Sequence, residues 1–308
     1  MSRIDAVVVA YRSQDHIAEC LRALRAVDGI ATVVVIDHGD GESARIAAAE
    51  GATALHESSN PGFGVGQNRG AQHGRAPYLL LVNPDAVVEP DAIARGLSLL
   101  DQTPDVAAAQ GAILNSCSGT PERSQGRELG PAHLVARALR VRGLLRIAPV
   151  RIVAGRTGLG ADHVERVPRA DVEVESLAAT ALLIRRQAFE QVGGFSPGYF
   201  LYGEDLDLCR RLRGEGWRLV ALPDIWARHD NGSSAATTHD RELTWWNGTM
   251  IFAARWWTRG AWFGAVAAAA VECMHQVALA PRDARRTARA LLLDPIEERR
   301  RRARAAES

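Results

Sequence analysis

The chain has 308 residues, and its 37 basic side chains nearly balance its 36 acidic ones, for a formal net charge of +1. All 37 basic residues are arginine, because the sequence contains no lysine. This excludes Schiff-base chemistry and a Walker-type phosphate loop, both of which need a lysine amine. Hydrophobic residues make up 47% and charged residues 24% of the chain, as in an ordinary globular protein. The balanced charge gives no sign of a nucleic-acid-binding protein.

The cysteines and the apolar segments indicate where in the cell the protein is expected. The four cysteines lie far apart without a CxxC pair, which predicts thiols kept free in a reducing cytoplasm. The apolar start is too short for a signal peptide and carries Asp5. The long apolar stretch Ala261–Ala280 contains Glu272, His275 and Gln276, whereas a spanning helix needs about 20 nearly uncharged residues. We therefore expect a packed or interfacial helix there, and a soluble or peripheral protein.

Strands and helices alternate along the first hundred residues. Ile4–Ala10 is a continuous β-branched run, which predicts a buried central strand of a parallel sheet. The next predicted element is a helix with Ser13 or Asp15 as its cap. Its apolar residues, spaced three and four apart, are Ile17, Cys20, Leu21 and Leu24. Further expected helices are 44–50, 66–73 and 91–100, and further expected strands are 32–36, 53–55 and 78–82. The alternation predicts an α/β fold with an open parallel sheet.

The pattern weakens after residue 115. Arg137–Arg156 holds six arginines and no acid among many aliphatic residues. It suits an amphipathic surface helix, or a basic stretch that contacts a membrane or an anionic acceptor. Beyond it, residues 172–184 have strand character, and the further expected elements are a helix at 205–214, two short strands around Pro223 and helices after residue 240.

Four polar segments follow the expected strands, at the ends where open α/β sheets bind ligands. They are Ala10–Ser13, Asp37–Asp40, Asn60–Gly70 and Asn83–Asp85. The glycines of the third segment do not match the GxGxxG spacing, and a dinucleotide motif belongs after the first strand. They suit either a close approach of backbone to a ligand or a turn that begins a helix.

Acidic residues and one histidine are candidates for chemistry. Asp85 follows a buried strand and is suited to hold Mg²⁺ or Mn²⁺ on a diphosphate, although a lone strand-end Asp also forms turns. Glu204 and Asp205 begin an expected helix, where the helix dipole favours acids and where a carboxylate facing a pocket can act as a general base. His229, in a polar loop, is equally compatible with a surface residue and a ligand.

Taken in chain order, these segments are similar to the motifs of a known protein family. They read VVVAYRS, VIDHGDGES, NPGFGVGQNRG and LLLVNPDAVVEP, followed by ALLIRRQAFEQVGGFSPGYFLYGEDLDLCRRLRGEGW and ARHDNGSS. Over about residues 4 to 234, the chain resembles the inverting family 2 glycosyltransferases, which have the nucleotide-sugar-binding GT-A fold. The NPD form and the GGF to GW block look most like the bacterial rhamnosyltransferase branch. That branch includes enzymes that add rhamnose to a polyprenyl-diphosphate-linked amino sugar.

The resemblance implies the following donor-binding residues. Ala10, Tyr11 and Ser13 would line the nucleotide, largely through backbone groups. Asp37 would accept the N3–H of a uracil or thymine ring. Asn68 would help to shape the donor pocket.

The resemblance also implies a diphosphate site and a catalytic base. Asp85 would hold Mg²⁺ or Mn²⁺ on the diphosphate, and His229 would approach it as a further ligand. Asp205 would deprotonate the acceptor hydroxyl, with Glu204 beside it orienting or binding the acceptor. The family's metal motif is often D-x-D, but here Asn83 stands in place of the first Asp, which leaves a less anionic donor site.

A second departure follows the second strand. The usual Asp-Asn-x-Ser-like turn reads Asp37-His38-Gly39-Asp40 here. Asp37 is retained, so recognition of the base is still expected, while the geometry of the turn is in question.

These features together predict an α/β GT-A fold with a mostly parallel central sheet flanked by helices. The glycosyltransferase domain is expected at 1–235, with a donor half at 1–114 and an acceptor-binding, catalytic half at 115–235. A helical extension is expected at 236–308. The balance of charge differs along the chain. Residues 1–281 carry 28 arginines and 31 acids, whereas residues 282–308 carry 9 arginines and 5 acids.

The expected reaction is a single displacement that moves a sugar, best matched by rhamnose from dTDP-rhamnose, to an acceptor hydroxyl. The acceptor fits a polyprenyl-diphosphate-linked sugar of cell-envelope synthesis. The alternatives are a secondary-metabolite enzyme with a UDP- or dTDP-sugar, a nucleotidyltransferase, and a nucleotide-sugar-binding protein without catalysis. We expect a cytoplasmic protein, and contact with the inner face of the plasma membrane and a homodimer stay open.

Overall fold

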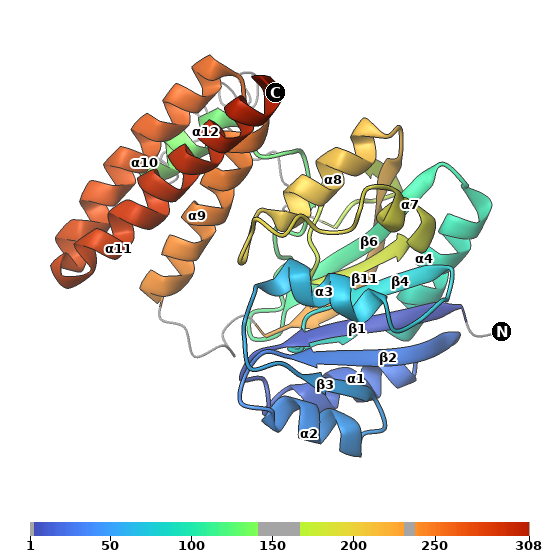
Figure 1. Ribbon diagram of the computed structural model, residues 1–308. Helices are drawn as coiled ribbons and strands as arrows, with labels where there is room; N and C mark the ends of the chain where they lie inside the picture. Colours follow the sequence, from blue (N-terminus) through green and yellow to red (C-terminus); the bar gives the residue numbers. More distant parts are fainter. Residues whose placement is uncertain (1–2, 141–166, 231–237, 308) are drawn as a thin grey trace. The chain divides into compact units, whose positions relative to one another are not determined.

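The computed structural model describes residues 3–140, 167–230 and 238–307 (Figure 1). The chain forms two compact units. One, the sheet unit, contains Met1–Arg127, His163–Pro197 and Asp205–Ala235. The other, the helical unit, contains Glu128–Asp162, Gly198–Glu204 and Ala236–Ser308. The domain boundaries expected from the sequence stay a prediction.

A nine-stranded sheet organises the sheet unit, with strand order β3-β2-β1-β4-β10-β6-β11-β5 and β8 paired to β11. Its strands are β1 Ile4–Ala10, β2 Ile30–Asp37, β3 Thr53–His56, β4 Tyr78–Val82, β5 Ala86–Val88, β6 Val106–Asn115, β8 Val172–Val174, β10 Ala181–Arg185 and β11 Arg218–His229. A separate pair joins β7 Gln125–Gly126 to β9 Ser176–Leu177. The strands β1 to β4, β6 and β11 run in one direction, and β5, β8 and β10 run in the other. The predicted α/β fold with a mostly parallel sheet is confirmed.

Helices cover both faces of this sheet. They are α1 Ile17–Arg25, α2 Glu42–Ala49, α3 Phe63–Ala71, α4 Pro90–Gln102, α7 Arg186–Gln191 and α8 Glu204–Gly214. Ile4 and Val8 of β1 pack into one core with α1 and α4, whereas Val7 packs into a second core with α3, α7 and α8. Successive side chains of a strand point to opposite faces, so both faces of β1 are buried. This explains why its sequence is an unbroken hydrophobic run.

Several predicted elements need correction. Helix α1 buries the four predicted residues, but its N-cap is His16 without a side-chain cap. Ser13 does not cap it, because its hydroxyl bonds the backbone of Tyr11, and Asp15 does not cap it either. The two strands expected around Pro223 are one strand, β11, with an irregular register there. The strand character expected at 172–184 is confirmed and is divided among β8, β9 and β10.

Strands β5 and β6 were not predicted. Strand β6 is rich in alanine and glycine, which are poor strand formers. The fold explains the glycine, since Trp226 of β11 lies fully buried beside Gly111. A Cβ added at Gly111 would lie 3.0 Å from the Cβ of Trp226, and one at Gly96 of α4 would lie 2.3 Å from its ring. Small residues in β6 and α4 therefore make room for one large indole.

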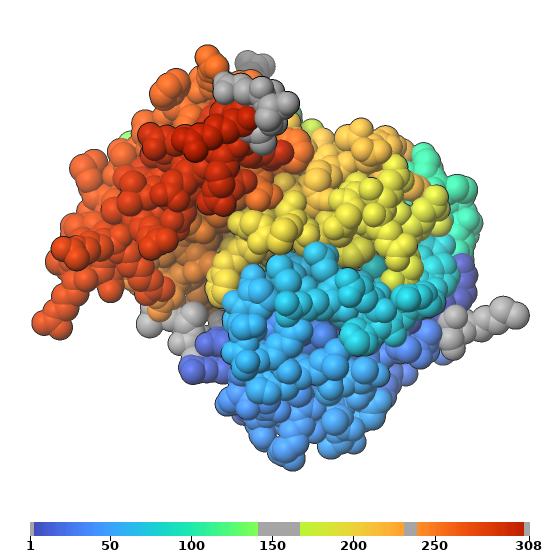
Figure 2. Space-filling view, viewed as in Figure 1, coloured from blue at the N-terminus to red at the C-terminus, as the bar shows by residue number. Residues whose placement is uncertain are grey.

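The helical unit contains the loop Gly198–Glu204 and the C-terminal helices. Its elements are α5 Pro131–Ala138, α9 Thr238–Trp256, α10 Arg259–Leu279, a 3₁₀ turn Pro281–Asp283, α11 Ala284–Ala288, a π-helical turn Arg289–Leu293 and α12 Asp294–Glu307. The C-terminal helices, orange to red in Figure 2, present a broad surface. Inside the unit, Trp246 and Phe252 are fully buried. Ion pairs join Arg137 to Glu242 and Arg255 to Glu298.

Two sequence expectations fall on this unit. Within the described residues, α10 is the one helix that is long and apolar enough to cross a membrane by length and composition, and a third of it is buried inside the unit. The helix expected at Ala261–Ala280 is present as α10, and the choice between a packed and an interfacial helix stays open. Of the basic stretch Arg137–Arg156, the part up to Arg140 is described, and residues 141–156 lie outside the described ranges.

Candidate active site

The end of β1 forms a tight, ordered turn. Ala10, its last residue, is buried. The Ser13 hydroxyl lies 3.3 Å from the backbone N and 3.2 Å from the carbonyl of Tyr11, and the Ser13 N–H donates to Ser43 of α2 at 3.2 Å. The Tyr11 side chain is 43% exposed. The predicted nucleotide-lining segment is thus held by its own polar groups and presents an aromatic ring to solvent.

Asp37, the last residue of β2, is fully buried. One carboxylate oxygen accepts the N–H of Gly39 at 2.7 Å, and the other accepts the N–H of Ala44, in the first turn of α2, at 3.0 Å. A negative charge at a helix N-terminus is favourable. Asp37 therefore closes the turn whose geometry the sequence left in question. Its contact with a nucleotide base stays a prediction.

The glycine-rich segment forms the start of α3 and packs closely. A Cβ added at Gly70 would lie 2.2 Å from Val7, and one at Gly66 would lie 2.7 Å from His38. Before the helix, Gly62 has a φ of +107°, which favours glycine. Of the two interpretations of this segment, the described contacts match the turn that begins a helix.

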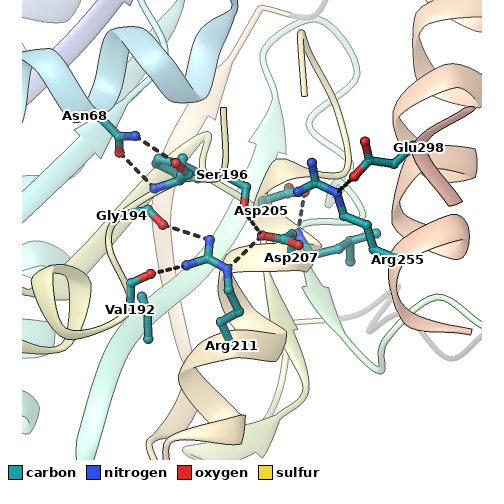
Figure 3. A network of polar contacts seen from close by, with 11 residues as sticks. Asn68, Val192, Gly194, Ser196, Asp205, Asp207, Arg211, Arg255 and Glu298 are labelled. Atoms are coloured by element: carbon teal, nitrogen blue, oxygen red, sulfur yellow. Dashed lines mark hydrogen bonds and ion pairs between the residues drawn. The ribbon is translucent and has the colours of Figure 1, made fainter. Parts of the chain in front are cut away.

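Asn68 ties α3 to the turn that precedes α8 (Figure 3). Its side-chain amide donates to the carbonyl of Phe195 and accepts the N–H of the same residue, both at 2.8 Å. These two bonds fix a loop that lies 127 residues away in the sequence. Asn68 is thus a positioning residue in this structure, and its effect on the shape of the donor pocket stays a prediction.

The same turn is held from the other side by α8 (Figure 3). Arg211 donates to the carbonyls of Val192, at 2.5 Å, and Gly194, at 2.8 Å. Asp207, which is buried, accepts from Arg211 and from the hydroxyl of Ser196, each at 2.8 Å. Charge-assisted hydrogen bonds such as these are stronger than neutral ones. The contacts connect α3, the turn and α8 into one network.

The proposed acids begin α8. Glu204 is buried and Asp205 is half-buried, with one Asp205 oxygen accepting the N–H of Leu206 at 2.8 Å. Tyr202 and Gly203, just before the helix, have φ angles of +66° and +84°. Two successive left-handed residues turn the chain sharply into the helix.

Asn83, Asp85 and His229 meet at the carboxyl edge of the sheet. His229 ends β11, which pairs with β5 directly after Asp85. Its Nε2 lies 3.1 Å from the Asp85 carboxylate and 3.3 Å from the Asn83 amide, and its Nδ1 lies 2.9 Å from Glu122. Burial lowers the pKa of His229, but hydrogen bonds to Asp85 and Glu122 outweigh it and raise the pKa to about 9. The ring is therefore a cation between two carboxylates at pH 7.

Glu122 is the member of this cluster that sequence reasoning missed. It follows β6, where a bridge between Leu114 and Pro121 turns the chain back. Its N–H donates to the carbonyl of Ile113 at 2.7 Å. The segment SGTPERS has the composition of a surface loop, so no motif marked it.

Comparison with known proteins identifies the chain. A family model described as glycosyltransferase like family 2 matches residues 2–248. The chain belongs to this family. It is 27% identical over 290 residues to the N-acetylglucosaminyl-diphospho-decaprenol L-rhamnosyltransferase of Mycobacterium tuberculosis, covering 83% of this chain and 89% of the relative. It is 26% identical over 246 residues to the rhamnosyltransferase WbbL of Escherichia coli, covering 74% and 84%.

Solved structures agree on the fold of this glycosyltransferase. The mannosyltransferase PcManGT from Pyrobaculum calidifontis, in complex with GDP-Man and Mn²⁺, aligns with a TM-score of 0.52 at 17% identity, over 96% of this chain and 85% of that one. S. aureus TarS 1-349 in complex with UDP-GlcNAc aligns with a TM-score of 0.50 at 12% identity, over 89% and 72%. The predicted GT-A fold is confirmed.

The cluster at His229 contains side-chain atoms of the kinds that bind metal ions. In the ranges that the structure describes, no three His, Cys, Asp or Glu side chains are arranged to hold a metal ion. Asp85 and His229 nevertheless offer a carboxylate oxygen and an imidazole nitrogen in contact with each other. Carboxylates suit both Mg²⁺ and Mn²⁺, and imidazole suits the transition metals. The donor types therefore fit a divalent cation, and His229 must lose a proton to bind one.

Proposed function

We propose that this glycosyltransferase moves a sugar from a nucleotide diphosphate to an acceptor hydroxyl with inversion at the anomeric carbon. The observation that supports it is the meeting of Asp85 and His229, 3.1 Å apart, at the ends of two strands far apart in the sequence. Both strands run in the same direction, so their ends share one edge of the sheet. Open α/β sheets bind their ligands at that edge.

In this proposal Asp205 acts as the general base. It takes the proton of the acceptor hydroxyl while the acceptor oxygen attacks the anomeric carbon. The bond between that carbon and the diphosphate oxygen breaks, and the nucleotide diphosphate leaves with the electron pair. Glu204 would orient the acceptor. The network of Asp207 and Arg211 supports this role, because it fixes the helix that carries Asp205.

The donor would lie across the ends of β1, β2 and β4. Ala10 and Ser13 would contact the nucleotide through backbone groups, and the exposed Tyr11 ring is suited to stack on a base. Asp37 would accept the base N3–H with a lone pair not used by its own loop. Asn83 would contact the diphosphate as a neutral donor.

Asp85 and His229 would hold Mg²⁺ or Mn²⁺ in the loaded enzyme. When bound, the cation supplies positive charge to the leaving diphosphate. Because the chain has no lysine, the remaining positive groups available to the diphosphate are arginine and backbone N–H groups. Glu122 would compensate in part for the acid that Asn83 replaces, since it adds a second carboxylate at His229.

The donor sugar is proposed to be rhamnose from dTDP-rhamnose, and the acceptor a polyprenyl-diphosphate-linked sugar of the cell envelope. Similarity to two rhamnosyltransferases over most of the chain supports the sugar. The name of the mycobacterial relative, which specifies a diphospho-decaprenol acceptor, supports the lipid.

A thermal-shift panel tests the donor. We expect dTDP-rhamnose with Mn²⁺, at about one hundred times its Kd, to raise the Tm by roughly 5–10 °C. UDP-N-acetylglucosamine and GDP-mannose at the same concentration serve as controls. A shift with a UDP-sugar alone would redirect the assignment to a UDP-sugar enzyme. If transfer occurs, NMR of the product gives the anomeric configuration, and retention would contradict the mechanism.

A further inference from the structure

Helix α10 turns two of its polar residues, Glu272 and Gln276, inward, whereas His275 is exposed. Glu272 and Gln276 are buried, and the Gln276 amide donates to Glu272 at 2.6 Å. His239 of α9 contacts Gln276 at 2.8 Å, and Arg140 lies 3.5 Å from Glu272. These four residues are among those that line an open pocket of about 620 Å³ in the helical unit. Glu272 and Gln276 are thus used in polar contacts within the unit, which argues against a membrane-spanning role for this helix.

The opposite side of α10 is apolar and exposed. We call it the outer stripe, which consists of Phe263, Ala267, Met274 and Ala278. Phe263 is 71% and Met274 is 66% exposed. At 100° per residue these positions fall within an arc of about 60°, and they extend along about 22 Å of helix. Large exposed apolar side chains aligned in this way mark an interaction surface.

Arginine stands at both ends of the outer stripe. Arg259 is the first residue of α10 and is exposed. Beyond its last residue the chain carries four more exposed arginines, Arg282, Arg285, Arg286 and Arg289, of which the last two pair with Asp240 and Asp294. Between Arg259 and Arg282, the single charged side chain is the buried Glu272. Exposed apolar side chains flanked by arginines are complementary to an anionic membrane surface, because the apolar groups can enter the interface while the arginines contact lipid phosphates.

We propose that the outer stripe of α10 docks on an anionic phospholipid surface, with the helix lying in the plane of the membrane and the arginines contacting lipid phosphates. A second copy of the chain is the other candidate for the stripe. Because arginine stands at both ends, parallel and antiparallel pairing of two α10 helices would each bring arginine against arginine. Like charges disfavour that contact, whereas an anionic membrane attracts the arginines at both ends of the stripe. The proposal does not rest on the sugar transferred.

Vesicle sedimentation with the full chain tests this surface. We expect binding to vesicles of phosphatidylglycerol and phosphatidylcholine in equal parts, and weak binding to phosphatidylcholine alone. High salt should weaken the binding by screening the arginines. The double variant Phe263→Ser with Met274→Ser should bind about tenfold or more weakly, because it removes the large apolar groups of the stripe. Ile225→Ser, an exposed apolar residue of the sheet unit, is the matched control.

The arginines are tested separately. Arg282→Glu with Arg285→Glu should weaken binding to anionic vesicles by at least about fivefold per arginine. Arg22→Glu with Arg75→Glu makes the same charge change on exposed residues of the sheet unit and should have a smaller effect. All variants change exposed side chains, and a retained Tm shows that they fold.

Two outcomes would overturn the proposal. The first is equal binding by the stripe variant and the Ile225→Ser control. The second is a dimer in size-exclusion chromatography that Phe263→Ser dissociates, together with no binding to anionic vesicles.

Discussion

The two units of this glycosyltransferase arrange polar and apolar groups in opposite ways. In the sheet unit, a hydrophobic sheet is buried and the working polar groups gather at its carboxyl edge, as Asp85 and His229 do. In the helical unit, Glu272 and Gln276 of α10 point inward, while Phe263 and Met274 point outward. The first pattern suits the binding of a polar ligand, and the second suits an apolar surface.

The largest expected effect is a loss of catalytic rate that leaves membrane docking unchanged. Asp205→Asn removes the proposed base and keeps the size of the side chain, so kcat should fall by about 10²–10⁴-fold. Donor binding in a thermal-shift assay and vesicle binding should both be retained. Glu215→Gln, on the exposed turn after α8, is the control. Near-normal transfer by Asp205→Asn would remove Asp205 from its role.

Asp85→Ala should have the next largest effect, again confined to the sheet unit. It removes the carboxylate proposed to hold a cation, so donor affinity measured with Mn²⁺ should fall by about tenfold or more. Titrations without metal should differ less between the variant and the parent. Identical curves with and without Mn²⁺ in both proteins would contradict a metal role for Asp85.

The charge cluster predicts a dependence of stability on pH. His229 has a pKa of about 9 in the folded protein against 6.5 in a model peptide. Its contribution to the free energy of unfolding is therefore full below pH 6.5 and lost as the pH rises through 9. We expect that loss, up to about 3 kcal/mol, in urea unfolding of the parent with EDTA. His229→Gln should lose less stability over the same range, and an equal loss would contradict the pKa.

The smallest effect is expected at the network in Figure 3. Asn68→Asp keeps the acceptor for the Phe195 N–H but places a carboxylate oxygen against the Phe195 carbonyl. We expect the protein to lose about 2 kcal/mol of its free energy of unfolding. As a positioning residue, Asn68 should also change kcat more than the donor Kd. Arg69→Gln, its neighbour on α3, is the control. Equal losses of stability and kcat in both variants would argue against a positioning role for the two Asn68–Phe195 hydrogen bonds.

Much of the sheet was predictable because its signals are local. Ile4–Ala10 and Tyr78–Val82 are unbroken apolar runs, and β1 and β4 have those bounds. Strand β6 was missed because it is rich in alanine, and because its Gly111 makes room for the Trp226 indole of β11, a neighbouring strand that is distant in the sequence. The cap of α1 was misassigned, since Ser13 bonds the turn before it.

The candidate site likewise contains one contact that the resemblance predicted and others that the sequence did not predict. The pairing of Asp85 with His229 was expected from the family resemblance, and the structure brings the two together. The contacts of Asn68 with Phe195 and of His229 with Glu122 join segments more than one hundred residues apart. No spacing in the sequence encodes such contacts.

The sequence by itself determined the family, the alternation of strands and helices, and the positions of polar residues at strand ends, because those features depend on residues near one another. The tertiary structure decided which polar groups serve the fold and which remain for ligands. In the folded chain Asp37 accepts a hydrogen bond from its own loop, Asn68 bonds a turn distant in the sequence, and Glu272 is buried in the helical unit. The physical reason is that a buried polar group must find a partner, and the fold determines which partners lie within reach.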